Sequence, residues 1–239
     1  MIKVKNASKN YKNGADWALK KISFQMQAGE FIYLVGPSGS GKSTLLKLLT
    51  RQEKLTSGSI QVNNILVDKI SDSKLYLLRR KLGIVTQEDL FLPQHTAFQN
   101  IAFAIEVVEK NPQPEMIYQR TTTVLEQVGM LDCQDKLITE LSIGQRKRIA
   151  IARALVNNPL VLLADEPTAN LDIKSSVEMM KIFLRIHDAG TSVIIATHDS
   201  TMVNSIRKRV LELDNGQLVR DEKFGGYTRI SDPKDVYVW

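Results

Sequence analysis

The sequence predicts an α/β fold built on short, buried parallel strands. Phe31–Val35 is an uninterrupted apolar run, and a glycine-rich turn and a leucine-rich helical segment follow it directly. Two further apolar runs, Leu160–Ala164 and Val193–Ala196, each end in polar residues. Continuous apolar runs of this length are typical of central strands in a parallel sheet.

The turn after the first strand has the spacing of a phosphate-binding loop, with glycine at the first and sixth places and then Lys and Ser. The glycines let the backbone curl with its N–H groups inward, and the following helix adds the partial positive charge of its N-terminus. In such loops Lys42 reaches the β- and γ-phosphates, and the Ser43 hydroxyl ligates Mg²⁺. A chance Gly/Ser turn is disfavoured because a strand precedes the loop and a helix follows it. The candidate residues are Gly36, Pro37, Ser38, Gly39, Ser40, Gly41, Lys42, Ser43 and Thr44.

Length and composition are those of an ordinary globular protein. The 239 residues are 43% hydrophobic and 24% charged, which is enough for a full core. No apolar run approaches the roughly 20 residues of a membrane span, and the first ten residues lack the apolar stretch of a signal peptide. Cys133 is the single cysteine, as is common in a reducing compartment. We therefore expect a cytoplasmic protein.

The net charge of +6 is compatible with nucleic acid, anionic lipid or nucleotide phosphates as partners. Basic residues form three short clusters at 79–81, 146–148 and 207–209. None is interleaved with aromatic residues as a nucleic-acid-binding surface would be. We interpret the clusters mainly as solvated faces, and we expect no nucleic-acid partner.

The N-terminal segments alternate apolar and polar residues. Residues 2–11 and 22–27 are predicted to be strands with one buried face, joined through a polar turn at 12–16. Tyr11 ends the first strand. An exposed aromatic ahead of a phosphate loop could stack on a nucleobase, and a core or strand-end tyrosine is an equally good interpretation.

A second group of elements follows the phosphate loop. Residues 60–62 are predicted to be a short strand and 73–80 a short helix, and Gly83–Gln87 is a buried strand that ends in an amide. Gln87 either approaches a metal ion or an attacking water, or it is an ordinary surface glutamine.

Helical spacing dominates from residue 88 to residue 158. We interpret this stretch as a helical subdomain inserted in an α/β core that comprises about 1–87 and 159–239. Three apolar residues at its start either pack internally or form an exposed patch for a partner. They are Phe91, Leu92 and Phe98.

The sequence LSIGQ at 141–145 precedes a helical segment that includes Leu155. Ser142 stands where an N-cap is expected. A serine, a glycine backbone and a helix N-terminus together make a second potential anion site, and a plain capped helix is the alternative.

Chemically reactive side chains follow two of the buried strands. Asp165 and Glu166 close one apolar run, and His198 follows another. Open α/β sheets bind ligands at the carboxyl ends of their strands. We predict that Asp165 holds Mg²⁺, that Glu166 polarises a water for attack on the γ-phosphate, and that His198 acts beside them.

Taken together, these motifs resemble those of ABC-type ATPase domains. The family's order and approximate spacing are matched, over nearly the whole chain, by GPSGSGKST, Gln87, LSIGQ, VLLADE and His198. The resemblance implies a P-loop NTPase with a RecA-like core, an antiparallel β subdomain and a helical subdomain. It also implies ATP and Mg²⁺ as ligands and hydrolysis to ADP and phosphate.

The resemblance also implies roles around a nucleotide held by the chain itself. Tyr11 resembles the adenine-stacking aromatic, and Gln87 resembles the glutamine that senses the γ-phosphate and Mg²⁺. Asp165 is similar to the metal-binding carboxylate and Glu166 to the catalytic one. His198 resembles the switch histidine.

A second set of residues resembles the part of the family that acts across a homodimer. Ser142, Gly144 and Gln145 are similar to the signature that binds ATP held by the opposite subunit. Asp172 resembles the aspartate of the loop after the catalytic carboxylate. The usual signature is LSGGQ, and Ile143 replaces its first glycine. A β-branched residue adds bulk and restricts the backbone there, so we expect a weakened but retained contact.

Within the family, the strongest likeness is to ATPases that act in cell division and regulate cell-wall hydrolysis. It is carried by LRRKLGIVTQEDLFL, AIARALVNNPLVLLADEPTANLD and VIIATHD. It implies an integral-membrane partner, an FtsX-like permease, that holds the ATPase on the inner face of the cell membrane. ATPases of lipoprotein-releasing and of macrolide- or peptide-export systems share much of this sequence and are the alternative assignment. ABC ATPases that act on nucleic acid or ribosomes usually carry long insertions or paired domains, which this chain lacks.

Overall fold

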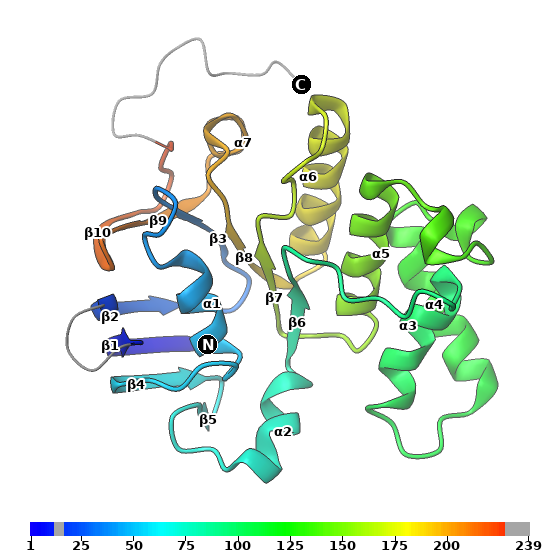
Figure 1. Cartoon of the computed structure of the whole chain (residues 1–239), viewed down its shortest axis with the longest axis horizontal. Helices are drawn as coiled ribbons and strands as arrows, with labels where there is room; N and C mark the ends of the chain where they lie inside the picture. The colour runs from blue at the N-terminus through cyan, green and yellow to red at the C-terminus, as the bar shows by residue number, and fades with distance from the viewer. Residues whose placement is uncertain (12–16, 228–239) are drawn as a thin grey trace. The chain divides into compact units, whose positions relative to one another are not determined.

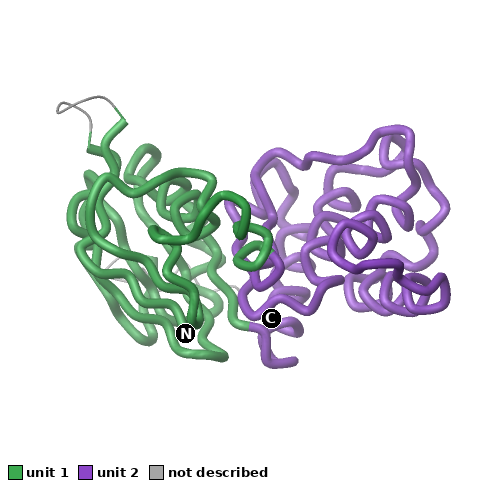
Figure 2. The backbone as a smooth tube through the Cα atoms, turned by 90° about the horizontal axis from the view of Figure 1, so that it is seen from below, with its two compact units in different colours: residues 1–79, 192–239 green, residues 80–191 purple. Residues whose placement is uncertain are grey.

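The computed structural model describes residues 1–11 and 17–227. The chain divides into two compact units, shown in different colours in Figure 2. Among the described residues, the first unit contains 1–79 and 192–227, and the second contains 80–191. The expected boundaries near 87 and 159 stay a prediction.

The first unit contains an antiparallel sheet with the strand order β2-β1-β4-β5 (Figure 1). Its strands are β1 (Ile2–Asn10), β2 (Trp17–Met26), β4 (Ser57–Val62) and β5 (Ile65–Leu66). Alternate residues of β1 and β2 are buried, as their sequence pattern predicts. β2 begins earlier than residue 22, because register shifts let its first residues stay paired with β1 as far as Trp17. The turn expected at 12–16 lies outside the described residues.

The strands that carry the phosphate loop belong to the order β10-β9-β3-β8 in the same unit. They are β3 (Phe31–Val35), β8 (Ser192–Ala196), β9 (Arg209–Asp214) and β10 (Gln217–Glu222). β3 pairs in parallel with β8 and β9, and all five of its residues are buried. β9 and β10 form an antiparallel hairpin. Asn215 and Gly216 both have positive φ at its turn, as a type I′ turn requires.

Short helices complete the first unit. They are α1 (Lys42–Leu49), the 3₁₀ turn η1 (Asp72–Lys74), α2 (Leu75–Arg79) and α7 (Ser200–Ser205). The helix predicted after the phosphate loop is therefore α1, and it buries its four leucines. The helix predicted at 73–80 is divided between η1 and α2.

The second unit combines a parallel strand pair with helices. The strands are β6 (Leu82–Val85) and β7 (Val161–Asp165). The helices are α3 (Ala97–Glu106), α4 (Pro114–Gln127), α5 (Ile143–Leu155) and α6 (Ile173–Asp188), with 3₁₀ turns η2 (Leu131–Cys133) and η3 (Ile138–Glu140). α3, α4 and α5 pack against one another, and α5 also packs on β6. The predicted α/β class is confirmed.

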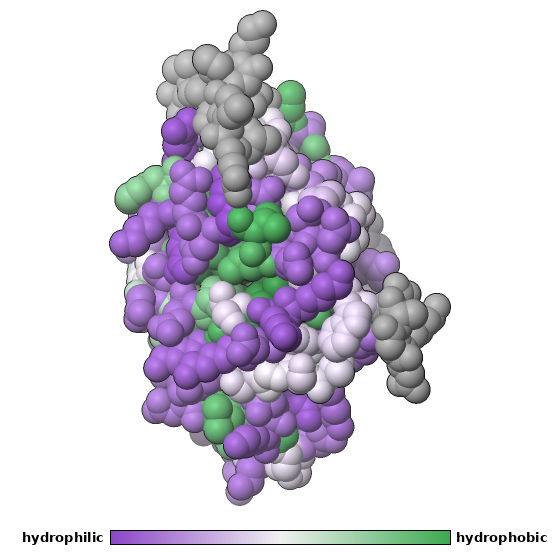
Figure 3. Space-filling model, turned by 90° about the vertical axis from the view of Figure 1, so that its left-hand side faces the viewer, coloured by the Kyte–Doolittle hydropathy of each residue, from purple (hydrophilic) through white to green (hydrophobic). Residues whose placement is uncertain are grey.

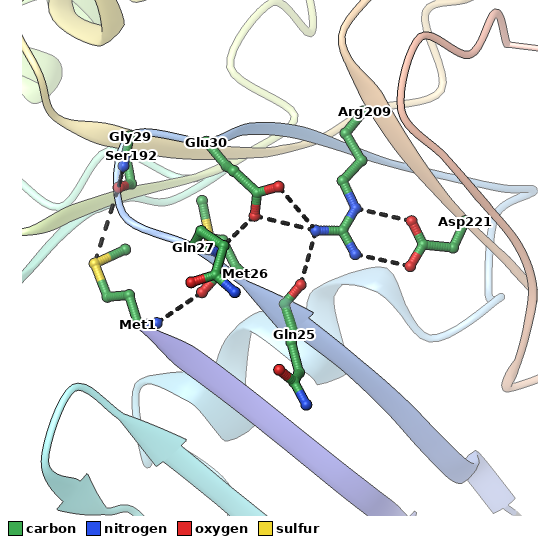
Figure 4. A network of polar contacts seen from close by, with 9 residues as sticks. All are labelled: Met1, Gln25, Met26, Gln27, Gly29, Glu30, Ser192, Arg209 and Asp221. Carbon is green, nitrogen blue, oxygen red and sulfur yellow. Dashed lines mark hydrogen bonds and ion pairs between the residues drawn. The ribbon is translucent and has the colours of Figure 1, made fainter.

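A polar network joins the two sheets of the first unit around Arg209 (Figure 4). Its guanidinium donates to the Gln25 carbonyl of β2 at 2.7 Å, to Glu30 at 3.1 Å and to Asp221 of β10 at 2.7 Å. Hydrogen bonds to Asp221, opposed by partial burial, raise the pKa of Arg209. The prediction that cluster 207–209 is a solvated face is therefore wrong at Arg209.

Polar residues dominate the face of the molecule in Figure 3, and a small group of apolar residues lies near its centre. Exposed apolar residues in small numbers are normal for a globular protein. No helix in the described part of the chain combines the length and apolar character needed to cross a membrane.

Candidate functional site

The phosphate loop closes tightly because two of its positions accept only glycine. Gly36 has φ +139° and Gly41 has φ +106°, a region that other residues rarely adopt. A Cβ at Gly36 would lie 2.0 Å from the Leu213 carbonyl oxygen. A Cβ at Gly41 would lie 2.5 Å from the Ala18 carbonyl oxygen. The loop is thus fixed against β9 on one side and β2 on the other.

The Lys42 side chain lies inside this loop. Its ammonium donates to the Gly36 carbonyl at 2.7 Å and to the Pro37 carbonyl at 3.1 Å, and only 7% of the residue is exposed. Gly41 caps α1 without a side-chain hydrogen bond, so no capping side chain occupies the first N–H groups of the helix. A glycine-rich loop, a helix N-terminus and a held cation together are suited to binding nucleotide phosphates.

Tyr11 lies beside the phosphate loop. Its hydroxyl is 3.5 Å from the Thr44 hydroxyl, and the Lys9 ammonium is 4.8 Å from the centre of its ring. The residue is 49% exposed, and β1 ends one residue before it. Tyr11 is therefore not a core residue, and its place directly after β1 is that of a strand-end tyrosine. An exposed ring near the loop is suited to stacking on a base.

His198 reaches the same sheet edge as the phosphate loop. β3 and β8 are parallel and place Leu34 opposite Ala196, so Gly36 and His198 both follow the carboxyl ends of adjacent strands. The Thr197 N–H donates to the Leu34 carbonyl at 3.1 Å and fixes the turn. His198 itself is exposed. Within the first unit, the structure thus places Tyr11 beside the phosphate loop and His198 at the sheet edge from which the loop leaves.

In the second unit, the acidic pair lies at the end of β7. The first four residues of this strand are buried and its last residue, Asp165, is half-buried. Glu166 follows in the left-handed region with φ +49°, which is unusual for a residue with a Cβ. This turn sends the chain out of the sheet immediately after the two carboxylates.

Gln87 lies two residues beyond β6, which ends at Val85 rather than at residue 87. Its side chain is exposed, and its carbonyl accepts a hydrogen bond from the Lys147 ammonium at 2.6 Å. Residue 87 is thus held through its backbone on a loop, and its amide is left at the surface.

Ser142 is the N-cap of α5, as the sequence predicts. Its hydroxyl accepts from the Gln145 N–H at 3.2 Å, and the Gln145 side-chain oxygen accepts from the Ser142 N–H at 2.9 Å. This reciprocal pair is a capping box. Ile143 begins the helix and is 48% exposed. A Cβ at Gly144 would meet nothing closer than 3.8 Å, so nothing within the described chain requires glycine there.

Asp172 is the N-cap of α6. One carboxylate oxygen accepts from the Ser175 N–H and the other from the Ser175 hydroxyl, both at 2.8 Å. These hydrogen bonds lower the pKa of Asp172. The cap is therefore charged at neutral pH, where it also complements the helix N-terminus.

Two of the three apolar residues at the start of the expected helical subdomain make internal aromatic contacts. The Phe91 ring lies 4.5 Å from the Arg153 guanidinium, and the Phe98 ring lies 6.0 Å from the Tyr118 ring. Phe98 belongs to α3. Leu92 is 37% exposed.

Lys147 is a residue whose position sequence reasoning missed. Cluster 146–148 was predicted to be a solvated face, yet Lys147 is 5% exposed and makes the contact with Gln87. The prediction is wrong at this residue. Helical periodicity contained a signal, because Lys147 stands four places before the buried Ile151.

Two of the residues predicted to bind Mg²⁺ offer oxygen ligands of the kind that this ion prefers. Ser43 offers a half-buried hydroxyl and Asp165 a half-buried carboxylate. No group of three or more acidic, histidine or cysteine side chains suited to a metal occurs among the residues that the structure describes. The Ser43 oxygen lies in the first unit and the Asp165 oxygen in the second. Each is of the kind that Mg²⁺ takes in nucleotide sites, where one or two carboxylates are joined by phosphates and water.

Comparisons with known proteins agree with these features. Residues 19–169 match the ABC transporter family. The cell division ATP-binding protein FtsE of Streptococcus pneumoniae is 45% identical over 227 residues, covering 95% of this chain and 97% of that protein. FtsE of Mycobacterium tuberculosis is 46% identical over 95% of this chain and 98% of its own length.

A solved structure is similar over the same length. It is the dimeric post-hydrolysis state of the ATP-binding cassette MJ0796, from Methanocaldococcus jannaschii, bound to ADP and Pi. It has a TM-score of 0.85 and 34% identity, and the match covers 95% of this chain and all of that chain. The phosphate loop, the LSIGQ helix and the acidic strand end thus occur in a chain that belongs to the ABC transporter family of ATP-binding proteins.

Proposed function

We propose that this chain is the ATP-hydrolysing subunit of an FtsE-like assembly that acts in cell division through a membrane partner. The observation that carries the proposal is the closed phosphate loop around Lys42, in a chain 45% identical to FtsE over 95% of its length. Several relatives with this name match over nearly their whole length, which favours cell division over lipoprotein, peptide or macrolide export.

Binding of the phosphates and of the adenine is assigned to residues of the first unit. The loop amides and Lys42 hold the phosphates, and Tyr11 stacks on the adenine. Ser43 and Asp165 would hold Mg²⁺, and Gln87 would offer it a side-chain amide oxygen. When bound, Mg²⁺ neutralises charge on the phosphate oxygens and supports in-line displacement.

Hydrolysis is assigned to Glu166 and His198. Glu166 aligns and polarises the attacking water, and His198 supports that arrangement. The amides of residues 36–44 and the Lys42 ammonium stabilise the charge that develops on the phosphates. Such catalysis is mainly positioning and electrostatics, which a rigid loop and a half-buried carboxylate supply.

The catalytic unit is a homodimer in which each copy completes the other's site. Ser142, Gly144 and Gln145 contact the ATP held by the second copy, and Asp172 lies in the same interface. This assignment is supported by Gly144, because the chain's own packing leaves room for a side chain there. A close approach by another molecule supplies a reason for glycine that the chain itself does not.

A membrane partner completes the assembly, which the similarity to FtsE over 95% of the chain supports. We assign that role to an FtsX-like permease, which places the ATPase on the inner face of the cell membrane. Purification from solubilised membranes followed by mass spectrometry tests this assignment. Recovery of a permease with an export system's periplasmic components would overturn the cell-division role and leave the ATPase role intact.

The Glu166→Gln variant tests the hydrolytic mechanism. We expect ATP affinity close to wild type, turnover lowered about 10²- to 10⁴-fold because general base catalysis contributes that much, and accumulation of an ATP-bound dimer. Phosphate release measures turnover, and light scattering after gel filtration measures the dimer. Rapid hydrolysis by this variant would show that Glu166 is not the catalytic carboxylate.

A further inference from the structure

Two cations of α5 hold the loop that carries Gln87. We propose that Lys147 is a positioning residue that fixes Gln87 relative to the N-terminus of α5, where Ser142 lies. The inference rests on the roles proposed above for Gln87 and Ser142 in ATP turnover. All of its contacts lie within the second unit.

The Lys147 ammonium makes its hydrogen bonds with residues of this loop. It donates to the Gln87 carbonyl at 2.6 Å and to Asp89 Oδ1 at 3.2 Å, and the Thr86 carbonyl is 3.5 Å away. These partners match the three donors of an ammonium group. The Lys147 and Asp89 side chains are 6% and 12% exposed. A buried charge needs its partners, so the loop cannot leave α5 without stranding both charges.

Arg153 provides a second attachment further along α5. Its guanidinium donates to the Leu90 carbonyl and lies 4.5 Å from the centre of the Phe91 ring. The loop therefore contacts two points of one helix over residues 86–91, after the backbone has left β6 at Val85. Two separated contacts fix both the position and the orientation of the loop relative to α5.

The first attachment lies close to the capping box of α5. Lys147 is five residues after Ser142, which corresponds to about 7.5 Å along a helix. A helical segment of that length is stiff, so a displacement of Gln87 is transmitted to Ser142 and Ile143 with little loss. Lys147 thus links the residue assigned to the chain's own nucleotide with the helix end assigned to the second copy's nucleotide.

Steady-state kinetics of the full chain provide the first test. Lys147→Met keeps most of the side-chain stem but removes the charge and all three donors. We expect kcat to fall about tenfold to a hundredfold, the size of effect that a misplaced catalytic group produces, with ATP affinity nearly unchanged. Lys147→Arg should recover a large part of kcat. An unchanged kcat in Lys147→Met, or a loss confined to ATP affinity, would overturn the proposal.

Arg148→Met is the matched control. It removes a cation from the next position of the same helix, where Arg148 contacts Glu178 and not the loop. We expect kcat close to wild type. Equal losses in Arg148→Met and Lys147→Met would mean that any change of charge on α5 has this effect, and the positioning role would be wrong.

Hydrogen–deuterium exchange separates positioning from simple support of the fold. In the Glu166→Gln background, ATP should slow exchange at both 86–91 and 142–146. With Lys147→Met added, the ATP effect should persist at 86–91 and be lost at 142–146. Loss at both segments together with faster exchange throughout 80–191 would indicate a purely structural role and overturn the proposal.

Two further variants keep the outcomes distinct. If Lys147→Met does not fold, Asp89→Asn tests the same contact, because it removes the charge pair and leaves the two carbonyl acceptors of Lys147. Asp89→Asn should lower kcat by a smaller factor than the one expected for Lys147→Met. If Gln87→Ala keeps wild-type turnover, the role proposed for Gln87 fails. If Gln87→Ala loses turnover while both contact variants keep it, only the inference about Lys147 fails.

Discussion

At the scale of single residues, the ammonium of Lys42 determines whether the loop binds ATP. It already lies inside the loop on two carbonyl oxygens, so little reorganisation is needed to place it on phosphate. Lys42→Ala should raise the Kd for ATP about 30-fold or more, since loss of a buried, charged hydrogen-bonding partner costs about 2–5 kcal/mol. Titration calorimetry measures the change. The exposed Lys47→Ala on the same helix is the control, and equal losses in both variants would contradict the assignment.

Residue positions were predictable where a short motif dictates the backbone. The phosphate loop is such a case, because Gly36 and Gly41 are required by positive φ and by neighbouring carbonyls. The burial of Lys147 was not predicted, because no short motif around this residue indicates it. A lysine in a basic cluster is usually solvated, and the partners that bury this one lie about 60 residues earlier in the chain.

At the scale of elements, α6 depends on the charge of its cap. Hydrogen bonds from Ser175 lower the pKa of Asp172 below its ordinary value of 3.8. The folded state therefore gains stability from this carboxylate above that value and loses it as the pH falls through the lower folded pKa. Asp172→Ala should lower the urea midpoint at pH 7, and its difference from wild type should narrow below about pH 4. Urea titrations monitored by circular dichroism measure both midpoints.

The cap prediction has a matched control in Asp172→Asn. Asparagine caps helices about as well as aspartate but does not titrate. We expect a midpoint at pH 7 between those of wild type and Asp172→Ala, because Asn keeps a capping hydrogen bond but lacks the charge, and we expect a weaker dependence on pH. A constant difference between wild type and Asp172→Ala from pH 7 to pH 3 would show that the carboxylate charge does not contribute.

Element types were predictable from periodicity, and element ends were not. The buried strands β3, β7 and β8 lie within one residue of their predicted ends, because uninterrupted apolar runs mark them. β2 is five residues longer at its start than its alternation indicates. Bulges between β1 and β2 shift the register there, and a strict alternation of period two does not detect them.

At the scale of the whole molecule, substitutions of Ile143 test how strongly two copies associate. It is half-exposed at the end of α5 that we assign to the second copy's nucleotide. Ile143→Gly should strengthen ATP-driven dimerisation about 2- to 10-fold, the value of one restored backbone hydrogen bond of about 0.5–1.5 kcal/mol. Analytical ultracentrifugation in the Glu166→Gln background measures the dissociation constant.

The matched variant for this prediction is Ile143→Ala, which removes bulk without adding the freedom of glycine. A gain in both variants would identify side-chain bulk as the cause of weak association. A gain in Ile143→Gly alone would identify the backbone. No change in either variant would contradict the idea that Ile143 weakens the contact between copies.

The sequence predicted the parts of the site better than their assembly. Each motif residue could be placed at the end of a strand or the start of a helix, because parallel strands and helix caps have local signatures. Contacts such as that of Lys147 with the Gln87 loop depend on how α5 packs on β6, and no local pattern contains that information. Contacts with a second copy are harder still to predict from one sequence. One indication is a glycine such as Gly144, which the packing of its own chain does not require.

At position 166, where the backbone is left-handed, folding and the proposed catalysis favour different residues. Folding favours glycine, asparagine or aspartate there, since these tolerate positive φ best, whereas the proposed chemistry requires a carboxylate of glutamate's reach. A saturation library at this codon would therefore rank differently under two selections. Sorted for soluble expression, it would enrich residues that relax the turn; sorted for ATP turnover, it would return glutamate. The wild-type residue is then a compromise in which some stability is given up for function.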